Sequence, residues 1–297
     1  MTPTPIPPEP LPELPLVVSV QSQVAFGHVG NSAAAFPMRA SGVEVVEVPT
    51  ALLSNHPHYP TMHGTLLDPE LVGGLLTGIA ERGVAARASV LLSGFLGRAG
   101  TASALAAFLV RAKAENPGLL YLCDPVMGDA DLGHFADAEL RRAFAAKLVP
   151  LADVILPNAF ELENLSGVPI AGPDDVVRAR EALGGPAVVA TSVPVPGRPG
   201  LLATVVATGE TCRSFEVPRL PVRPAGTGDL LGGLTAARLA QGLALPDAVG
   251  RAVAGVAQAL RRTASTPWAE MPIAAVIDSI LAAEWNGAAA EALTKPR

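Results

Sequence analysis

The stretch "RPAGTGDLLGGLTAARLAQG", residues Arg223–Gly242, joins a glycine-rich turn to an apolar run with helical spacing. We expect a helix that begins near Gly228 or Asp229, because the leucines after this point recur at helical intervals. Glycines just before a helix let backbone N–H groups point outward together, and the helix dipole reinforces this anion site. Asp229 is then either a helix cap or a base beside a bound phosphate, and "GTGD" alone does not decide between the two.

The rest of the chain alternates between strand-like and helix-like segments. The strand-like segments are nearly continuous apolar runs, which is typical of a parallel sheet covered on both faces. A polar turn between two later strands predicts an antiparallel hairpin. We expect strands at 16–21, 43–48, 88–94, 119–125, 153–158, 187–191, 201–208 and 212–217. We expect helices within 27–42, over 68–82, 101–115, 136–148 and 173–183, a short one opening at Ala159, and further helices from Asp229 onward.

This order predicts an α/β protein with a doubly wound, mostly parallel central sheet flanked by helices and a small antiparallel hairpin. The 297 residues suit one large domain, which we place at 16–285. Residues 1–15 are rich in proline and are expected to form a disordered, extended arm, and residues 286–297 a C-terminal tail.

The composition argues against two classes of partner and indicates where the protein is located. The net charge is −6, and no cluster of lysines and arginines occurs that would follow a phosphate backbone, so we expect no nucleic acid partner. No apolar run approaches the roughly 18 residues of a membrane span, so we expect a soluble protein with no membrane partner. Cys123 and Cys212 lie in apolar, strand-like segments, which predicts reduced, buried thiols in a cytoplasmic protein.

Ligands of such sheets bind outside the carboxyl ends of the strands. Polar residues or glycines follow each early strand here: Ser22 with "FGHVGN", then "TALLSNHPHY", "SGFLG", "CDPVMGD" and "PNAFELE". Asp124, Asp129 and Glu161 would repel one another at one sheet edge unless a cation such as Mg²⁺ lay among them. Alternatively, Asp124 caps a turn and Glu161 is a partner of a helix dipole.

The histidines form a weaker pattern. His56, His58 and His63 lie in a proline-interrupted loop without cysteine or helical spacing, which disfavours a zinc site. We interpret the loop as one that contacts a small ligand or is merely solvated. His28 and His134 are isolated, and we expect structural roles for both.

Six motifs in a fixed order, "GHVGNSAAAFPMRASG", "LSNHPHY", "LSGFLG", "CDPVMGD", "PNAFELENLSG" and "GTGDLLGGL", resemble those of the pyridoxal kinases of the ribokinase-like superfamily. The resemblance runs from about Val17 to about Thr263. It implies ATP-dependent phosphorylation of the 5′-hydroxymethyl group of pyridoxal, pyridoxamine and pyridoxine in vitamin B6 salvage. It further implies Mg²⁺, a monovalent cation such as K⁺, and a homodimer.

The resemblance also implies roles for single residues. Asp229 would be the base, and the amides of Gly226, Thr227 and Gly228 would hold the transferring phosphoryl group. Asp129 and Glu161 would organise Mg²⁺ through water. The substrate would contact Ser22, Pro57, His58 and Asp229. The nucleotide would contact Asp124, Leu156, Glu161, Ser192, Val217, Pro218, Arg219, Leu220 and Thr227.

The sequence departs from the family pattern in three places. Pro57 and His58 replace a threonine and a small or amide residue, and Phe95 replaces a tyrosine. Leu156 replaces a threonine or alanine beside the nucleotide phosphates. The first two departures remove hydroxyls from the vitamin pocket, so substrate preference is more open to change than the phosphoryl chemistry.

Two other functions remain open. Hydroxymethylpyrimidine kinases use the same base and phosphate site, although the "SNHPHY" loop favours pyridoxal. A non-catalytic protein that binds pyridoxal phosphate would explain the lost hydroxyls at Pro57 and Phe95, whereas the retained Asp124, Glu161 and Asp229 argue against it.

Overall fold

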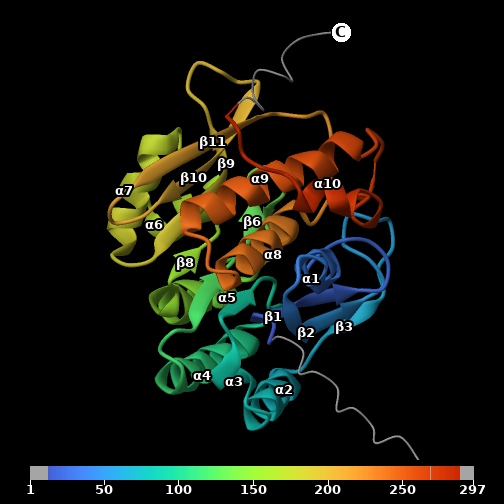
Figure 1. Ribbon diagram of the computed structural model, residues 1–297, viewed down its shortest axis with the longest axis vertical. Helices are drawn as coiled ribbons and strands as arrows, with labels where there is room; N and C mark the ends of the chain where they lie inside the picture. The colour runs from blue at the N-terminus through green and yellow to red at the C-terminus, as the bar shows by residue number, and fades with distance from the viewer. Residues whose placement is uncertain (1–12, 268, 288–297) are drawn as a thin grey trace, which may run out of the picture.

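The computed structural model describes residues 13–267 and 269–287. Most of the predicted arm at 1–15 and of the predicted tail at 286–297 therefore lies outside the described residues. The described part is built around a nine-stranded sheet with strand order β11-β10-β9-β8-β5-β4-β1-β2-β3 (Figure 1). This arrangement confirms the predicted α/β fold.

The middle of the sheet is parallel, and its two ends are antiparallel. Strands β2, β1, β4, β5, β8 and β9 pair in parallel, whereas β3 runs antiparallel to β2, and β10 antiparallel to both β9 and β11. The predicted hairpin is thus β10–β11. The strands are β1 (Leu16–Val24), β2 (Glu44–Leu53), β3 (Gly64–Leu66), β4 (Val90–Ser93), β5 (Leu120–Cys123), β8 (Val154–Ile155), β9 (Ala187–Pro194), β10 (Leu201–Ala207) and β11 (Cys212–Pro218).

Helices cover both faces of this sheet (Figure 1). Consecutive residues of β1 show why its sequence is a continuous apolar run: Val17 packs into one core cluster and Val18 into the other. On the Val17 side lie α1 (Asn31–Ala40), α8 (Thr227–Ala240), α9 (Leu245–Arg262) and α10 (Ile277–Leu281). On the Val18 side lie α2 (Pro69–Glu81), α3 (Val84–Arg87), α4 (Ala99–Glu115), α5 (Ala138–Ala143), α6 (Ala159–Ser166) and α7 (Pro173–Leu183).

The structure differs from the sequence-based expectations at a few elements. The helix expected over 136–148 divides: Asp137 caps α5, and the chain then continues as the π-helical turn η1 (Phe144–Leu148) and the 3₁₀ turn η2 (Val149–Leu151), whose Pro150 has no N–H to continue the helix. A second 3₁₀ turn, η3 (Ala274–Val276), precedes α10. The strand β3 and the small hairpin of β6 (Gly128–Asp129) and β7 (Gly133–His134) were not expected. Each is two or three residues long, too short for a periodic signal.

The prediction of two buried thiols is half wrong. Cys123 is buried, and desolvation raises the pKa of its thiol to about 12. Cys212 is exposed, because it opens β11, which lies at the end of the sheet and pairs with β10 alone. Among the described helices, none is long and apolar enough to cross a membrane.

Helices α1 and α8 approach each other closely at Gly233. A Cβ at this position would lie 2.8 Å from the Cβ of Ala34. We predict that Gly233→Ala destabilises the fold by about 1–3 kcal/mol, because the two helices would have to separate. Gly74→Ala in α2 is the matched control, since no atom lies within 4 Å of its added Cβ, and it should stabilise by about 0.4–1 kcal/mol. Urea unfolding measures both, and equal effects would contradict the prediction.

Candidate active site

The N-terminus of α8 is the centre of the candidate site. The helix begins at Thr227, one residue earlier than expected, so the N-cap position belongs to Gly226, and Asp229 is the third helical residue. Gly226 adopts φ 83°, and any side chain here would overlap the carbonyl oxygen of His28. Its lack of a side chain therefore lets the loop after β1 approach this helix end, and because no side chain caps the helix, its first N–H groups are available to an anion.

Asp229 lies in the first turn, where it faces the loop after β1. The backbone N–H of Gly30 donates a hydrogen bond to its carboxyl, which lowers the pKa of the group, but desolvation outweighs this and raises the pKa overall. The residue remains partly exposed. Its carboxyl is thus held at a defined place from which it can still reach a ligand.

Asp124 reaches the same place from the end of β5. Its residue is 7% exposed, and one carboxyl oxygen would lie 3.7 Å from a Cβ added at Gly228. Burial raises the pKa of Asp124 well above its usual value, and the charges of Glu161 and Asp229 raise it further. The structure therefore brings Asp124, Glu161 and Asp229 to one edge of the sheet, as the sequence predicted.

Glu161 is held more tightly than the other two. One carboxylate oxygen accepts the N–H groups of Met127 (2.8 Å) and Gly128 (3.2 Å), and the other accepts the N–H of Asn158 (3.0 Å). Asn158 in turn accepts the N–H of Glu161, which completes a capping box on α6. Although these bonds favour the charged form, burial raises the pKa of Glu161 to about 7. Glu161 thus fixes the "CDPVMGD" loop as well as capping its own helix.

Asp129 points toward a basic partner. Its carboxylate lies 2.6 Å from one terminal nitrogen of Arg223, and the other terminal nitrogen of Arg223 pairs with Asp131. Nothing in the sequence analysis assigned a role to Arg223. Within residues 13–267 and 269–287, no three histidine, cysteine or acidic side chains converge closely enough to hold a metal ion by themselves.

Ser22 and Gly30 form the other wall of the site. Ser22 is buried at 6% exposure, and a Cβ at Gly30 would lie 2.6 Å from its hydroxyl oxygen. Gly30 therefore touches Ser22 and donates its N–H to Asp229. The predicted vitamin contact, Ser22, and the predicted base, Asp229, thus both neighbour Gly30. Asn31 accepts a hydrogen bond from the Ser19 hydroxyl (2.7 Å), which ties α1 to β1 behind this wall. Asn31 ends the "FGHVGN" motif, whereas no sequence pattern pointed to Ser19.

The loop after β2 carries Pro57 and His58, two of the positions that depart from the family pattern. His56 is buried, His58 is partly exposed, and Pro57 is exposed. His56 and His58 line a cavity of about 350 Å³ together with residues 221–225, 264–267 and 269. Pro57 and Phe95 do not line this cavity, and the carbonyl of Phe95 accepts a hydrogen bond from Thr50 (2.6 Å).

The predicted nucleotide contacts follow the same edge of the sheet. Leu156 comes directly after β8, and Val217 and Pro218 end β11, which runs in the direction of β8 and β9. Ser192 is exposed and adopts φ 56° where the register between β9 and β10 shifts. The N–H of Arg219 donates to the carbonyl of Gly200, and this bond fixes the chain before Leu220.

Known proteins are similar to this chain in sequence. A family model described as phosphomethylpyrimidine kinase matches residues 62–273. A pyridoxine/pyridoxal/pyridoxamine kinase of Bordetella bronchiseptica is 36% identical over 90% of this chain and 96% of its own length. A pyridoxal kinase of Leifsonia xyli is 40% identical over 73% of this chain and 78% of its own length. The chain belongs to the pyridoxal kinase family.

Solved structures of pyridoxal kinases share the fold. The enzyme of Leishmania donovani in complex with ADP and pyridoxine superposes with a TM-score of 0.82 at 26% identity, covering 91% of this chain and 96% of its own. The enzyme of Entamoeba histolytica has the same fold, with a TM-score of 0.84 at 22% identity over 92% and 98% of the two chains. The sheet, the open N-terminus of α8 and the acidic edge thus belong to a kinase.

The raised pKa of Glu161 has a consequence for stability. Because the folded pKa of about 7 exceeds the ordinary glutamate pKa of 4.5, the folded state holds this proton more tightly than the unfolded state. The contribution of Glu161 to the free energy of unfolding therefore falls as pH rises from about 4.5 to about 7. We predict that the stability advantage of the native chain over Glu161→Gln is larger at pH 5 than at pH 8. Denaturant unfolding at both pH values measures this difference in stability. A difference that is constant or grows with pH would contradict a raised pKa of Glu161 in the folded state.

Proposed function

We propose that this kinase transfers the γ-phosphoryl group of ATP to the 5′-hydroxymethyl group of pyridoxal, and also of pyridoxamine and pyridoxine, in vitamin B6 salvage. The observation that carries the proposal is the placement of Asp229. Its carboxyl lies in the first turn of α8, is fixed by the N–H of Gly30 and faces the edge at which Asp124 lies. The relatives named above support the substrate class.

In the proposed reaction, the substrate hydroxyl attacks the γ-phosphorus while its proton passes to the carboxylate of Asp229, and ADP leaves. A base with a raised pKa suits this task, because it binds the proton more strongly than an ordinary surface aspartate. The amides of Gly226, Thr227 and Gly228 would hold the phosphoryl oxygens at the positive end of the helix dipole. Ser22 would orient the pyridine ring, with His58 and Pro57 at the rim.

The nucleotide would lie on the β8–β11 side of Asp229. Leu156 follows β8, Ser192 lies in the last part of β9, and the segment from Val217 to Leu220 spans the end of β11. Thr227 would contact the phosphates at the N-terminus of α8, and Asp124 and Glu161 would lie beside the phosphates of the nucleotide. The partners in this proposal are small molecules only.

The acidic edge fits Mg²⁺ held together with the phosphates of ATP. Mg²⁺ usually keeps several waters and binds one or two carboxylates plus substrate phosphates. Burial is the main cause of the raised pKa of Asp124, and the repulsion from Glu161 and Asp229 that adds to it is the charge pattern that a divalent cation relieves. Glu161 already accepts three backbone N–H groups, and Asp129 is paired with Arg223, so both suit an indirect role through water. Mg²⁺ would neutralise phosphate charge, and a monovalent cation such as K⁺ remains part of the proposal.

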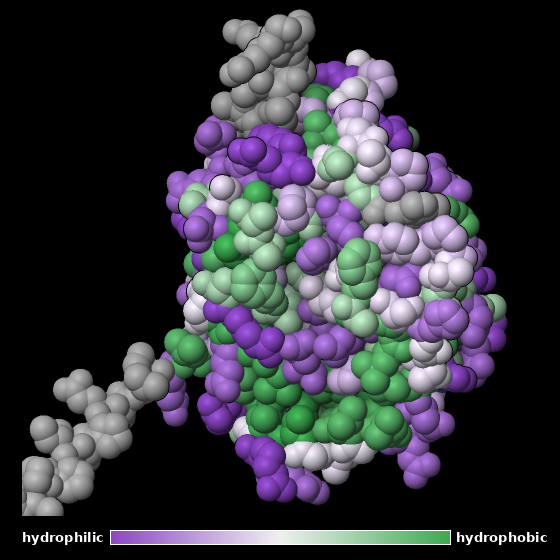
Figure 2. All heavy atoms as spheres, turned by 90° about the vertical axis from the view of Figure 1, so that its right-hand side faces the viewer, coloured by the Kyte–Doolittle hydropathy of each residue, from purple (hydrophilic) through white to green (hydrophobic). Residues whose placement is uncertain are grey.

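We also propose a homodimer in the cytoplasm. Apolar atoms gather on the lower part of the face drawn in Figure 2, the face on which α2 and β3 lie in Figure 1. The exposed large apolar side chains of β2 and α2 include Leu52, Leu71 and Leu75. Exposed apolar surface of this kind is typical of protein–protein contacts.

The base assignment predicts a specific loss of turnover. Asp229→Asn should lower kcat by about 10²–10⁴-fold, because the amide cannot accept the proton, while ADP affinity is largely kept. Steady-state kinetics and ADP titration measure the two quantities. Asp247→Asn is the matched control: Asp247 lies in the first turn of α9 and pairs with Arg213 at the surface. Comparable turnover of Asp229→Asn and the native chain would refute the base and favour a non-catalytic binding protein.

The preferred alcohol separates the two candidate kinase activities. The matching family model is described as phosphomethylpyrimidine kinase, so hydroxymethylpyrimidine is the competing substrate. We expect higher kcat/KM for pyridoxal and pyridoxamine than for hydroxymethylpyrimidine when each is assayed with MgATP. The opposite order would assign the chain to the pyrimidine alcohol while leaving Asp229 as its base.

A further inference from the structure

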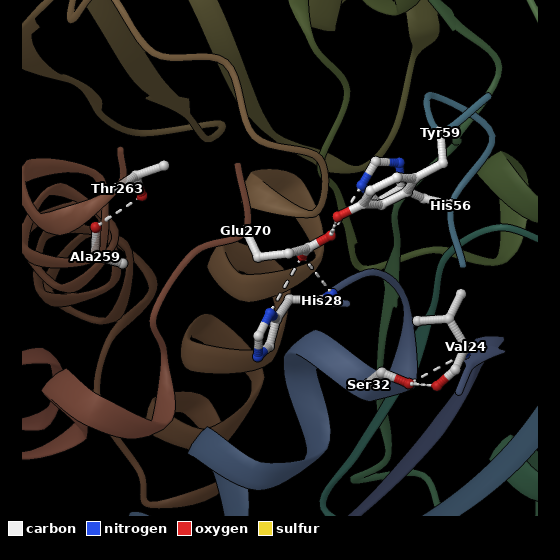
Figure 3. A network of polar contacts seen from close by, with 8 residues as sticks. All are labelled: Val24, His28, Ser32, His56, Tyr59, Ala259, Thr263 and Glu270. Carbon is white, nitrogen blue, oxygen red and sulfur yellow. Dashed lines mark hydrogen bonds and ion pairs between the residues drawn. The ribbon is translucent and has the colours of Figure 1, made fainter. Parts of the chain in front are cut away.

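Glu270 joins three segments that are distant in sequence. It lies in the segment between α9 and η3, with a side chain 17% exposed. One carboxylate oxygen accepts the backbone N–H of His28 (2.9 Å) and lies 3.3 Å from Nδ1 of the same residue. The other lies 3.0 Å from Nε2 of His56 and accepts the hydroxyl of Tyr59 (3.0 Å). Figure 3 shows the carboxylate between these partners.

The contacts around His56 define its tautomer. The N–H of His58 donates to Nδ1 of His56 (3.3 Å), so Nδ1 carries the lone pair and Nε2 carries the proton. Nε2 therefore donates to Glu270. Burial is the largest influence on His56 and lowers its pKa, in keeping with a neutral ring. The loop after β2 is thus held by a neutral histidine and a tyrosine hydroxyl on one carboxylate oxygen.

The loop after β1 is held by the other oxygen, and this loop reaches the base. His28 donates its N–H to Glu270, and its carbonyl oxygen lies against Gly226, the residue that caps α8. Two residues later, Gly30 donates its N–H to Asp229. Gly27 lets the carboxylate of Glu270 come close to this loop, because a Cβ at position 27 would lie 2.6 Å from that carboxylate.

Glu270 also determines the distance between two walls of the cavity described above. His56 and His58 form one wall, and residues 264–267 and 269, adjacent to Glu270 in the chain, form another. Pro57 between the two histidines is exposed and has no hydroxyl or N–H to hold the loop in place. Its neighbours His56 and Tyr59 attach the loop to Glu270.

We propose that Glu270 is a positioning residue for the alcohol substrate: its carboxylate holds the loops at 27–30 and 54–59 in the arrangement that places Ser22, His58 and Asp229 around the vitamin. The inference rests on the proposed function, because it assigns the cavity side of these loops to the alcohol. Glu270 itself need not touch the substrate, since both of its oxygens are occupied by protein donors.

Glu270→Gln is the sharpest test, because it keeps the shape of the side chain. An amide presents one oxygen and one NH₂ group, whereas donors face both oxygens of Glu270. The variant can therefore satisfy one loop and must place its NH₂ group against the donors of the other. We expect the KM for pyridoxal to rise roughly tenfold or more, while the KM for ATP changes by less than about twofold. Glu270→Ala should show the same split with a larger rise.

Glu284→Gln is the matched control. Glu284 is exposed, also follows α9 in the chain and pairs with Arg251 (3.0 Å). It should leave both KM values unchanged. Thermal unfolding of all variants is measured alongside. If Glu270→Ala does not fold, the KM values of Glu270→Gln alone test the inference.

Three outcomes would overturn the inference: equal rises in both KM values, unchanged kinetics in Glu270→Gln, or a fall in kcat alone. Failure of the proposed function is seen separately, in the native chain. If the native chain prefers hydroxymethylpyrimidine, the same KM comparison is made with that alcohol and decides the role of Glu270. If it phosphorylates neither alcohol, both the function and the inference fall.

Discussion

The structure depends on the close approach of the loop after β1 to the first turn of α8. The carbonyl of His28 lies where a side chain at position 226 would be, and the N–H of Gly30 donates to Asp229. Neither contact tolerates a Cβ at Gly226 or Gly30, since the added atom would overlap backbone oxygens. The glycines therefore allow a strand end and a helix start to form one surface, on which the proposed base faces the proposed vitamin contact, Ser22.

Buried carboxylates lower the stability of the same region. Asp124 and Glu161 are almost fully buried, and burial raises the pKa of each. Burying carboxylates side by side lowers stability unless they are protonated or neutralised. Backbone N–H groups satisfy Glu161, whereas Asp124 has the charges of Glu161 and Asp229 close by. Folding thus maintains an unfavourable charge pattern at the place where MgATP would relieve it.

Most of the fold followed from local sequence patterns, and much of the site followed from topology. Continuous apolar runs indicated buried parallel strands, and the motifs after them supplied Ser22, Asp124 and Glu161 because parallel strands end at one edge. The exposed Cys212 could not be foreseen, since no local pattern shows that β11 lies at the end of the sheet. Glu270 could not be foreseen either: 242 residues separate it from His28, and its flanking sequence carries no motif.

Glu270 and Asp229 hold the same short loop from two sides, and their environments differ. The carboxylate of Glu270 is surrounded by donors from His28, His56 and Tyr59, which occupy both of its oxygens. Asp229 has one backbone donor from this loop and a pKa raised by desolvation. A fully satisfied carboxylate is suited to holding structure, whereas a sparsely satisfied one keeps a lone pair for a proton. The difference in their surroundings is why we assign the chemistry to Asp229 and the positioning to Glu270.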